Sequence, residues 1–494
     1  MSFLLILPVL MPIAAGICVW LIPALNTSAH RSRITLATLF ATLALLVPIL
    51  LMGEMTLPLF TLSDNLPIFL HADALGKLFA CVMAFVWAMA GMYSFEYMTH
   101  EGHEKRYHAL NLMTLGVLMG LCFSGSIVTF YMFYEAMTLL TMPLVMHSGR
   151  KDAVAAGIKY LIYSVLGASL VLLGLFVLAP CMTGVSFIPG GALDASKAAG
   201  RESFILIFGF LMLAGFGAKA GLFPLHGWLP TAHPAAPSPA SAVLSGVITK
   251  AGVLGVIRLI WYWLGAETLR GTWVQTTLIA LALLTVLAGS LLAYREHHLK
   301  KRLAWSTVSQ VSYVLLGLLT LSPAGFVGAL LHVVCHSLCK DVLFMSAGSI
   351  ILHTGETDVR RMTGLGRRMP VTLGCFAAAA LGLVGIPPCL GFFSKWELAQ
   401  AALSMADVPS FLNWLIPVVL LVSALLTAGY LLPIVLKGFF PGCNEDRAVC
   451  SPDAAAESWS MLIPMLVLAI LSVLLGMFPG PLTALTADLA AMLM

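Results

Sequence analysis

Isolated charged residues interrupt long apolar segments of this 494-residue chain. The segment KAGLFPLHGWLPTAHPAAPSPASAVLSGVITK, residues 219–250, has a lysine at each end and no other charge. Glu135 is likewise the only carboxylate in VTFYMFYEAMTLLTMPLVMH. A buried lysine can exchange its proton, whereas arginine stays charged, and a carboxylate in hydrocarbon stays ionised only beside a cation. We therefore interpret Glu135 and Lys219 as a pair that switches charge by proton transfer, with Lys250 as a further proton-exchanging group.

The segment ALLHVVCHSLCKDVLFMSAGSI carries titratable residues at helical spacing. His332, His336 and Lys340 recur every four residues, so they share one helix face over about 12 Å. HxxxH spacing also suits a metal ion, but this face has no third ligand and Lys340 would repel a cation. We expect a path for protons or a hydrated ion here, with a structural polar seam as the alternative.

Lys219 and Lys395 both stand beside residues that break helices. The breaking residues around Lys219 are Gly215, Gly217, Gly221 and Pro224, and those before Lys395 are Gly385, Pro387, Pro388 and Gly391. A membrane helix is broken only where protein or water satisfies the freed backbone groups, so both lysines should lie beside polar cavities. His226 and His233, in the proline-rich link after Lys219, are suited to relaying protons or to loop hydrogen bonds.

The elements that must hold these residues are transmembrane helices. The chain is 60% hydrophobic and 10% charged, whereas soluble domains carry roughly 25% charged residues. Apolar segments of about 20 residues recur throughout, so we predict an all-α polytopic membrane protein with about 14 transmembrane helices. They are expected near residues 3–25, 33–53, 75–98, 109–124, 126–147, 154–180, 203–223, 239–264, 275–294, 304–321, 325–352, 371–402, 411–436 and 459–480.

The two interrupted helices predict an internal repeat. They lie five helices apart, which fits two inverted five-helix units, helices 4–8 and 9–13. The predicted regions are 1–108 (helices 1–3), 109–264 and 275–440 (the two repeats) and 459–494 (the last helix).

Lysines and arginines gather in the loops after odd-numbered helices, whereas the other loops hold only Lys197, Arg201 and Arg270. By the positive-inside rule, both termini face outward. Lys77 and Lys159 lie near helix ends and are expected to snorkel to the interface. Arg258 is either an interfacial anchor or part of a buried pair.

Ten cysteines are present without any CxxC pair, so iron–sulfur or zinc-ribbon ligation has no support. Most lie in apolar segments, where a thiol behaves as a small hydrophobic group. Cys443 and Cys450 share a polar loop and could form a disulfide. We expect no metal and no cofactor in this chain.

Four motifs, in this order and spacing, resemble the antiporter-like membrane subunits of respiratory complex I (NADH:quinone oxidoreductase). Large Mrp antiporter subunits and the membrane arms of energy-converting hydrogenases belong with them. The motifs are FYEAMTLLTMPLV, KAGLFPLHGWLPTAHPAAP followed by GVITK, LLHVVCHSLCKDVLFMSAGSIILHTGETDVRRMTGLG, and GIPPCLGFFSKWEL. The resemblance covers roughly residues 70–440.

The resemblance implies fourteen helices with two inverted repeats and a midplane chain of polar residues. In it, Glu135 and Lys219 look like the glutamate–lysine pair and Lys250 like the central relay. His332 and Lys340 look like the second channel, and Lys395 like its terminal lysine. Family members of this type hold no redox centre, so electrons would travel in partner subunits.

Asp341 departs from the family pattern and could hold Lys340 charged. The chain ends soon after the last predicted helix, without a long lateral helix, and Lys395 favours Mrp or hydrogenase types. We expect a proton-translocating subunit of a complex I-like redox-driven complex in a prokaryotic cytoplasmic membrane, beside other membrane subunits and without nucleic acid. A Mrp-type Na⁺/H⁺ antiporter subunit is the alternative, and a stand-alone solute transporter is less well supported.

Overall fold

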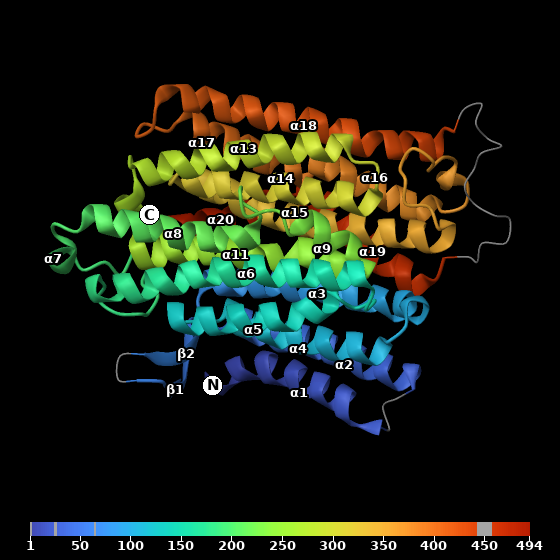
Figure 1. Cartoon of the computed structure of the whole chain (residues 1–494), viewed down its shortest axis with the longest axis horizontal. Coiled ribbons are helices and arrows are strands. Elements are labelled where there is room, and N and C mark those ends of the chain that lie inside the picture. Colours follow the sequence, from blue (N-terminus) through green and yellow to red (C-terminus); the bar gives the residue numbers. More distant parts are fainter. Residues whose placement is uncertain (1, 24–26, 64–65, 442–456) are drawn as a thin grey trace.

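The computed structural model describes residues 2–23, 27–63, 66–441 and 457–494. Helices run side by side along the long axis of the molecule, and their connections lie at the two ends of the bundle (Figure 1). Within these ranges, eleven helices are long and apolar enough to cross a membrane. The chain is therefore an integral membrane protein of the all-α class. The predicted Cys443–Cys450 bridge lies outside the described residues.

The first part of the chain pairs helices with a short β-hairpin. Its helices are η1 (Ser2–Ile6), α1 (Leu7–Leu21), α2 (Ser28–Leu51), α3 (Ala74–Glu101), α4 (Glu104–Cys122), α5 (Ile127–Val145) and α6 (Lys151–Leu178). Strands β1 (Met55–Thr61) and β2 (Pro67–Ala72) pair antiparallel, with an irregularity between Pro58 and Phe60. The hairpin was not predicted from the sequence, because its residues lie in a connection between two long apolar segments.

The middle of the chain contains the most irregular helices. Its elements are η3 (Ala179–Cys181), α7 (Ala195–Ala198), α8 (Glu202–Ala220), α9 (Leu229–Ala235), α10 (Ser238–Val243), α11 (Thr249–Ile257) and α12 (Ala266–Leu269), with π-helical turns η4 (Leu244–Ile248) and η5 (Arg258–Leu264). Elements α10 to η5 form one continuous span. A π-helical turn adds a residue to the helix and often lies at a functional site.

The last part of the chain forms a second set of long helices. They are α13 (Trp273–Arg295), α14 (Leu299–Leu319), α15 (Pro323–Thr354), η6 (Leu365–Arg367), α16 (Pro370–Val384), α17 (Leu390–Leu403), α18 (Ser410–Phe439), α19 (Trp459–Met477) and α20 (Gly480–Leu493). The start of α1 and the end of α20 lie toward the same end of the bundle, the left of Figure 1, as do β1, β2 and α7.

The predicted helices and the observed ones differ at several places, one of which is α20, which follows the last predicted helix. The predicted helix 371–402 is two helices, α16 and α17, separated at the Gly-Ile-Pro-Pro-Cys segment. Helices α4 and α14 occupy predicted positions but begin with charged residues, and they are not among the eleven apolar spans. The count of fourteen spans, the inverted repeats and the regional boundaries therefore stay predictions.

Two spans lie at the centre of the protein. The apolar windows of Ser238–Leu264 and of α15 are fully buried, whereas those of the outer helices are about one third to two thirds buried. Charged residues on these two spans cannot reach lipid, so snorkelling does not account for them.

Candidate functional site

Lys219 lies in the last turn of α8, which ends at Gly221 in the left-handed region (φ 84°). Its ammonium donates hydrogen bonds to Thr138 Oγ1 (2.9 Å), Tyr160 Oη (2.9 Å) and Ser164 Oγ (3.0 Å). An ammonium has three N–H donors, so all three can be satisfied by neutral hydroxyl groups of α5 and α6. We call these four residues the Lys219 cluster.

Glu135 is not in ion-pair contact with Lys219. Both residues are described, and no N–O distance between them is within the 4.0 Å of the ion pairs found elsewhere, such as Arg31–Glu104 at 2.7 Å. Lys219 bonds to Thr138, which lies one turn from Glu135 on α5, and Glu135 also neighbours the exposed Met132 and Leu139. Glu135 is half-buried, and its Oε1 has no hydrogen-bond partner. The two side chains are therefore not in direct contact, and the charge-switching pair expected from the sequence stays a prediction.

Lys250 and His336 meet between the two central spans. The Lys250 ammonium is hydrogen-bonded to His336 Nδ1 and donates to the backbone oxygen of Ser245 at 2.8 Å. Both side chains are buried, and the buried Asp341 contacts Gly246, the residue next to Ser245. We call Lys250, His336 and Asp341 the central cluster.

His332 connects the centre to the broken helix α16–α17. Its Nδ1 is 2.9 Å from Ser394 Oγ, and its Nε2 is 3.2 Å from Gln310 Oε1. The ring stacks on Tyr313 with centroids 5.4 Å apart and lies 6.2 Å from the ring of His336. His332 is therefore hydrogen-bonded on both sides, as a proton-relaying imidazole must be.

Lys395 is held by the break in this helix. Its ammonium donates to the backbone oxygens of Leu383 (2.6 Å) and Val384 (2.9 Å) and lies 5.2 Å from the centre of the Tyr313 ring. The last carbonyl groups of a helix lack partners within it and carry partial negative charge. The break therefore creates the acceptors that hold the half-buried Lys395. We call His332, Gln310, Ser394 and Lys395 the His332 cluster.

Lys340 is the remaining lysine of the predicted face. It is fully buried and donates a 3.0 Å hydrogen bond to the backbone oxygen of Leu303. Together, the predicted residues fall into the three clusters, Lys340 and the half-buried Glu135. Among the described residues, no side-chain hydrogen bond joins the Lys219 cluster to the central cluster.

The sequence did not reveal a buried hydroxyl network beside these clusters. Ser290 Oγ is 2.8 Å from Ser309 Oγ and 2.6 Å from Ser423 Oγ. Tyr430 donates to Ser306 Oγ at 2.7 Å, and Gln310, which contacts His332, donates to Thr427 at 3.4 Å. Serine and threonine are common in apolar helices, so only the packing of α13, α14 and α18 identifies this network.

Lys300 was assigned to a basic loop, but it is buried in α14. Its ammonium donates to the backbone oxygen of Ala236 at 2.5 Å. The neighbouring His233 is fully buried, stacks on Phe344 at 4.9 Å and has no hydrogen-bond partner at either ring nitrogen. Three adjacent charges, Lys300 to Arg302, suggested a solvated loop. On a helix, however, neighbouring residues point in different directions, and only Lys301 of the three faces solvent.

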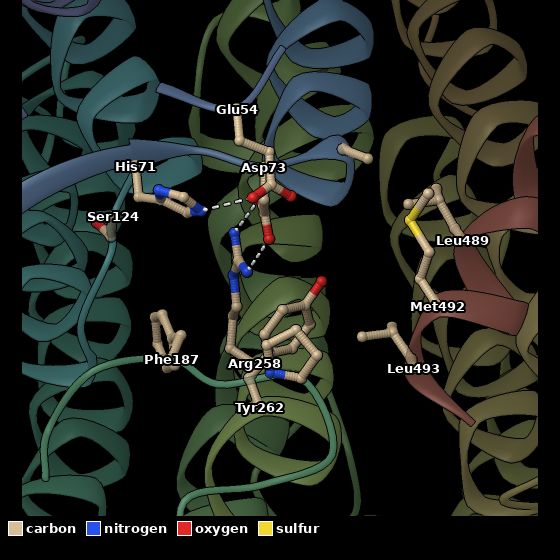
Figure 2. Close-up of a pocket in the computed structure, with 12 residues that line it drawn as sticks. Glu54, His71, Asp73, Ser124, Phe187, Arg258, Tyr262, Leu489, Met492 and Leu493 are labelled. Carbon is tan, nitrogen blue, oxygen red and sulfur yellow. Dashed lines mark hydrogen bonds and ion pairs between the residues drawn. The ribbon is translucent and has the colours of Figure 1, made fainter. Parts of the chain in front are cut away.

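Arg258 forms a buried ion pair, one of the two alternatives expected for it. Its guanidinium donates to both carboxylate oxygens of Asp73, at 2.5 and 2.8 Å. Figure 2 shows this pair beside a cavity of about 230 Å³, with His71 and Glu54 on the hairpin side and the end of α20 opposite. The pair ties the start of α3 to η5. Its two-point geometry suits a structural role, because two guanidinium nitrogens meet both carboxylate oxygens.

Comparisons with known proteins agree with this architecture. The family described as NADH:quinone oxidoreductase/Mrp antiporter, transmembrane, matches residues 124–427. The chain is similar to NADH-quinone oxidoreductase subunit N of Desulforudis audaxviator, with 36% identity over 80% of this chain and 79% of that protein. It is also similar to hydrogenase-4 component B of Escherichia coli, with 30% identity over 83% of this chain.

The chain spans 62% of the length of hydrogenase-4 component B. A solved structure of the Mrp complex from Dietzia sp. DQ12-45-1b contains a chain with the same fold, at a TM-score of 0.85. It shares 23% sequence identity and covers 100% of this chain and 97% of its own. The sequence motifs, the fold and the buried polar clusters have one explanation: this chain belongs to the NADH:quinone oxidoreductase/Mrp antiporter transmembrane family.

Proposed function

We propose that this chain is a proton-translocating, antiporter-like subunit of a complex I-like, redox-driven membrane complex. The observation that supports it most strongly is the burial of Lys250, His332, His336 and Lys340 on the two central spans. Charged groups are costly inside a membrane and normally mark an ion path. Lysine and histidine can both exchange protons, which suits them to carrying protons through the bilayer.

Each cluster has its own part in the proposed path. The Lys219 ammonium is held by hydroxyl groups alone, so no carboxylate locks its proton in place. His336 contacts Lys250, and His332 connects onward through Ser394 to the segment that carries Lys395. Glu135, half-buried on α5, is placed to exchange charge with Lys219 through Thr138 or with a neighbouring subunit.

The partners of this chain follow from its relatives. One relative is named as a subunit of NADH-quinone oxidoreductase and another as a component of hydrogenase-4. We propose that other membrane subunits cover part of its exposed apolar surface and that electron transfer takes place in those partners, with no cofactor or metal held by this chain. The exposed apolar side chains of α18, such as Trp414 and Leu425, suit either lipid or such a subunit.

A Mrp-type Na⁺/H⁺ antiporter subunit without redox coupling is the second candidate. The fold it shares with a chain of a Mrp complex supports that possibility. Identity of 36% with subunit N favours the redox-driven assembly.

Purification of the assembled complex that contains this chain, followed by reconstitution in liposomes with an internal pH dye, separates these candidates. We expect acidification or alkalinisation of the lumen only when an electron donor and acceptor are supplied. Proton movement driven by a sodium gradient alone would instead establish the antiporter. Hydrogenase or dehydrogenase subunits in the same purified complex, identified by mass spectrometry, are the expected accompanying result.

We further propose that the chain lies in the cell membrane with both termini on the outer side. The basic loops support this orientation by the positive-inside rule. A C-terminal epitope tag should be cleaved by protease added to spheroplasts. Protection of the tag until the membrane is permeabilised would reverse the proposed orientation.

A further inference from the structure

Asp341 is a fully buried carboxylate that the proposed path does not yet use. It lies in the middle of α15, and neither carboxylate oxygen accepts a hydrogen bond from any described residue. A buried ionised carboxylate is costly unless a cation compensates it. The group must therefore be compensated from nearby or carry a proton.

The Asp341 carboxylate occupies the space that a side chain at position 246 would fill. A Cβ atom built on Gly246 would lie 1.6 Å from Asp341 Oδ2. Gly246 belongs to the π-helical turn η4, and its backbone oxygen accepts a 2.7 Å hydrogen bond from Ser337. The absence of a side chain at Gly246 thus lets the acid of α15 press against the backbone of the other central span.

Lys250 reaches the same turn. Its ammonium folds back to the backbone oxygen of Ser245, the residue next to Gly246. The carboxylate and the ammonium therefore contact adjacent residues of one widened helical turn. Both residues are described, and no N–O distance between them is within the 4.0 Å of the ion pairs found elsewhere, such as Arg258–Asp73, so they are neighbours at one turn without direct contact.

The other cations nearby are held elsewhere. Lys340, next to Asp341 in sequence, donates to Leu303 O, and Lys300 donates to Ala236 O. Adjacent helix residues point about 100° apart, so Asp341 does not compensate Lys340 as the sequence suggested. The titratable groups that face this region from α15 itself and from the helices packed on it are His336, Lys340, Lys250, Tyr93, His233 and Lys300.

From this geometry we propose that Asp341, on α15, is the proton partner of Lys250, on the other central span. Asp341 would thereby be a further residue of the transport path. At rest, Lys250 is an ammonium and Asp341 a carboxylate. When the Lys250 ammonium leaves His336, its proton passes to Asp341, which leaves a neutral amine and a carboxylic acid. No electron moves, and the pair has zero net charge before and after, so the transfer buries no unpaired charge.

This inference rests on the proposed function for its purpose, but its test does not measure transport. The complex containing the full chain is purified as wild type, Lys250→Met, Asp341→Asn and the double variant. Infrared spectra in H₂O and D₂O report the C=O stretch of a protonated carboxyl group. The first difference, Lys250→Met minus the double variant, isolates the carboxyl signal of Asp341 when Lys250 is absent. The second difference, wild type minus Asp341→Asn, isolates that signal when Lys250 is present.

We expect the isotope-sensitive carboxyl band in the first difference and its absence in the second, because only loss of Lys250 forces Asp341 to hold a proton. Lys340→Met, which removes the neighbouring lysine, is the matched control and should not create the band. A band of equal size with and without Lys250 would mean permanent protonation and would overturn the proposal. Absence of the band in both would mean that another cation compensates Asp341, which overturns it equally.

Assembly supplies a second, independent readout. Each single substitution leaves one buried titratable group that must be neutralised at a cost in free energy, whereas the double variant removes both groups. We expect more assembled complex from the double variant than from Lys250→Met alone. Equal or lower recovery of the double variant would show that the two side chains are not coupled. If the reconstituted wild-type complex transports no protons, the proposed function is refuted. The infrared and assembly readouts would be unaffected, because neither measures transport.

Discussion

At the scale of single residues, the lysines of this chain differ in what holds them. Lys219 is held by three hydroxyl groups, Lys395 by the carbonyl groups of a helix end, and Lys250 by an imidazole and a carbonyl group. All of these partners are neutral, or can be. A lysine without a fixed counter-ion gives up its proton more readily than one in a tight ion pair, so the surroundings suit proton exchange.

Substitution of Lys219 tests this interpretation. We expect Lys219→Arg to abolish proton transport nearly as fully as Lys219→Ala, because arginine keeps the charge but does not release its proton. Transport is measured in reconstituted liposomes, with assembly checked by the amount of intact complex. Lys159→Met, a half-buried lysine elsewhere on α6, is the matched control and should transport normally. Full activity of Lys219→Arg would show that charge alone is required.

Glu135 does not contact Lys219 directly, so its part in the predicted pair needs an experiment. We expect Glu135→Gln to abolish coupled transport, because glutamine cannot exchange a proton. The complex should still assemble, because Oε1 of the half-buried carboxylate has no hydrogen-bond partner to lose. Transport and assembly are measured as for Lys219. Normal pumping by Glu135→Gln would remove this carboxylate from the path.

At the scale of elements, helix irregularity positions the polar groups. The π-helical turn η4 frees backbone oxygens that Lys250 and Ser337 use. The break between α16 and α17 supplies the acceptors of Lys395, and the close approach of Gly391 to the Gly382 oxygen sets the angle between the two helices. The irregularities are thus where the carbonyl groups needed inside a membrane become available.

Gly391→Ala should misplace Ser394 and Lys395. A Cβ atom there would lie 1.9 Å from the Gly382 backbone oxygen, so α17 must move away from α16. We expect the stability of the protein, measured by thermal denaturation in detergent, to fall by about 1–3 kcal/mol. Transport, measured in liposomes, should weaken. Gly374→Ala, in α16 with no atom within 4 Å of the new Cβ, is the control. It should be neutral or stabilise the helix by up to about 1 kcal/mol.

At the scale of the whole molecule, long-range contacts tie distant segments to the central spans. Asp73 and Arg258 join the start of α3 to the end of the buried span across 185 residues of sequence. Tyr93 of α3 donates a 2.8 Å hydrogen bond to the Met345 oxygen of α15, so α3 is bonded to both central spans. These contacts hold the two buried spans in register.

Arg258→Met should destabilise the protein strongly. It leaves the Asp73 carboxylate buried without its cation, which typically costs about 3–5 kcal/mol. Thermal denaturation in detergent measures the loss. We expect the double variant Asp73→Leu/Arg258→Met to regain much of this stability, because neither charge remains. A double variant as unstable as the single one would show that the pair is not the cause.

The same pair predicts a pH dependence. Burial by itself raises the pKa of Asp73, but the Arg258 guanidinium outweighs it and lowers the net pKa below the ordinary 3.8. A carboxyl group with a lowered pKa in the folded state contributes stability that is complete above 3.8 and is lost as pH falls through the folded value. Asp73→Asn should therefore lose stability near neutral pH and show a smaller further loss on acidification than wild type. Parallel acid denaturation curves for the two proteins would contradict this.

Much of the protein followed from the sequence. Apolar segments long enough to span a bilayer identified the helical membrane class, because lipid allows few other ways to satisfy a backbone. The motifs around Lys219, Lys340 and Lys395 indicated the family, and the family matches residues 124–427. Isolated charges in such segments were recognisable as candidate sites, because their cost in hydrocarbon demands a purpose.

Only the tertiary structure decided which groups meet. Lys219 bonds to Thr138 and not directly to Glu135, and Asp341 contacts Gly246 in the π-helical turn to which Lys250 also bonds. The burial of Lys300 and the Ser290–Ser309–Ser423 network likewise depend on how helices pack. Sequence specifies the cost of burying a charge, but its partner lies across a helix interface, where rotation by a single residue changes the neighbour.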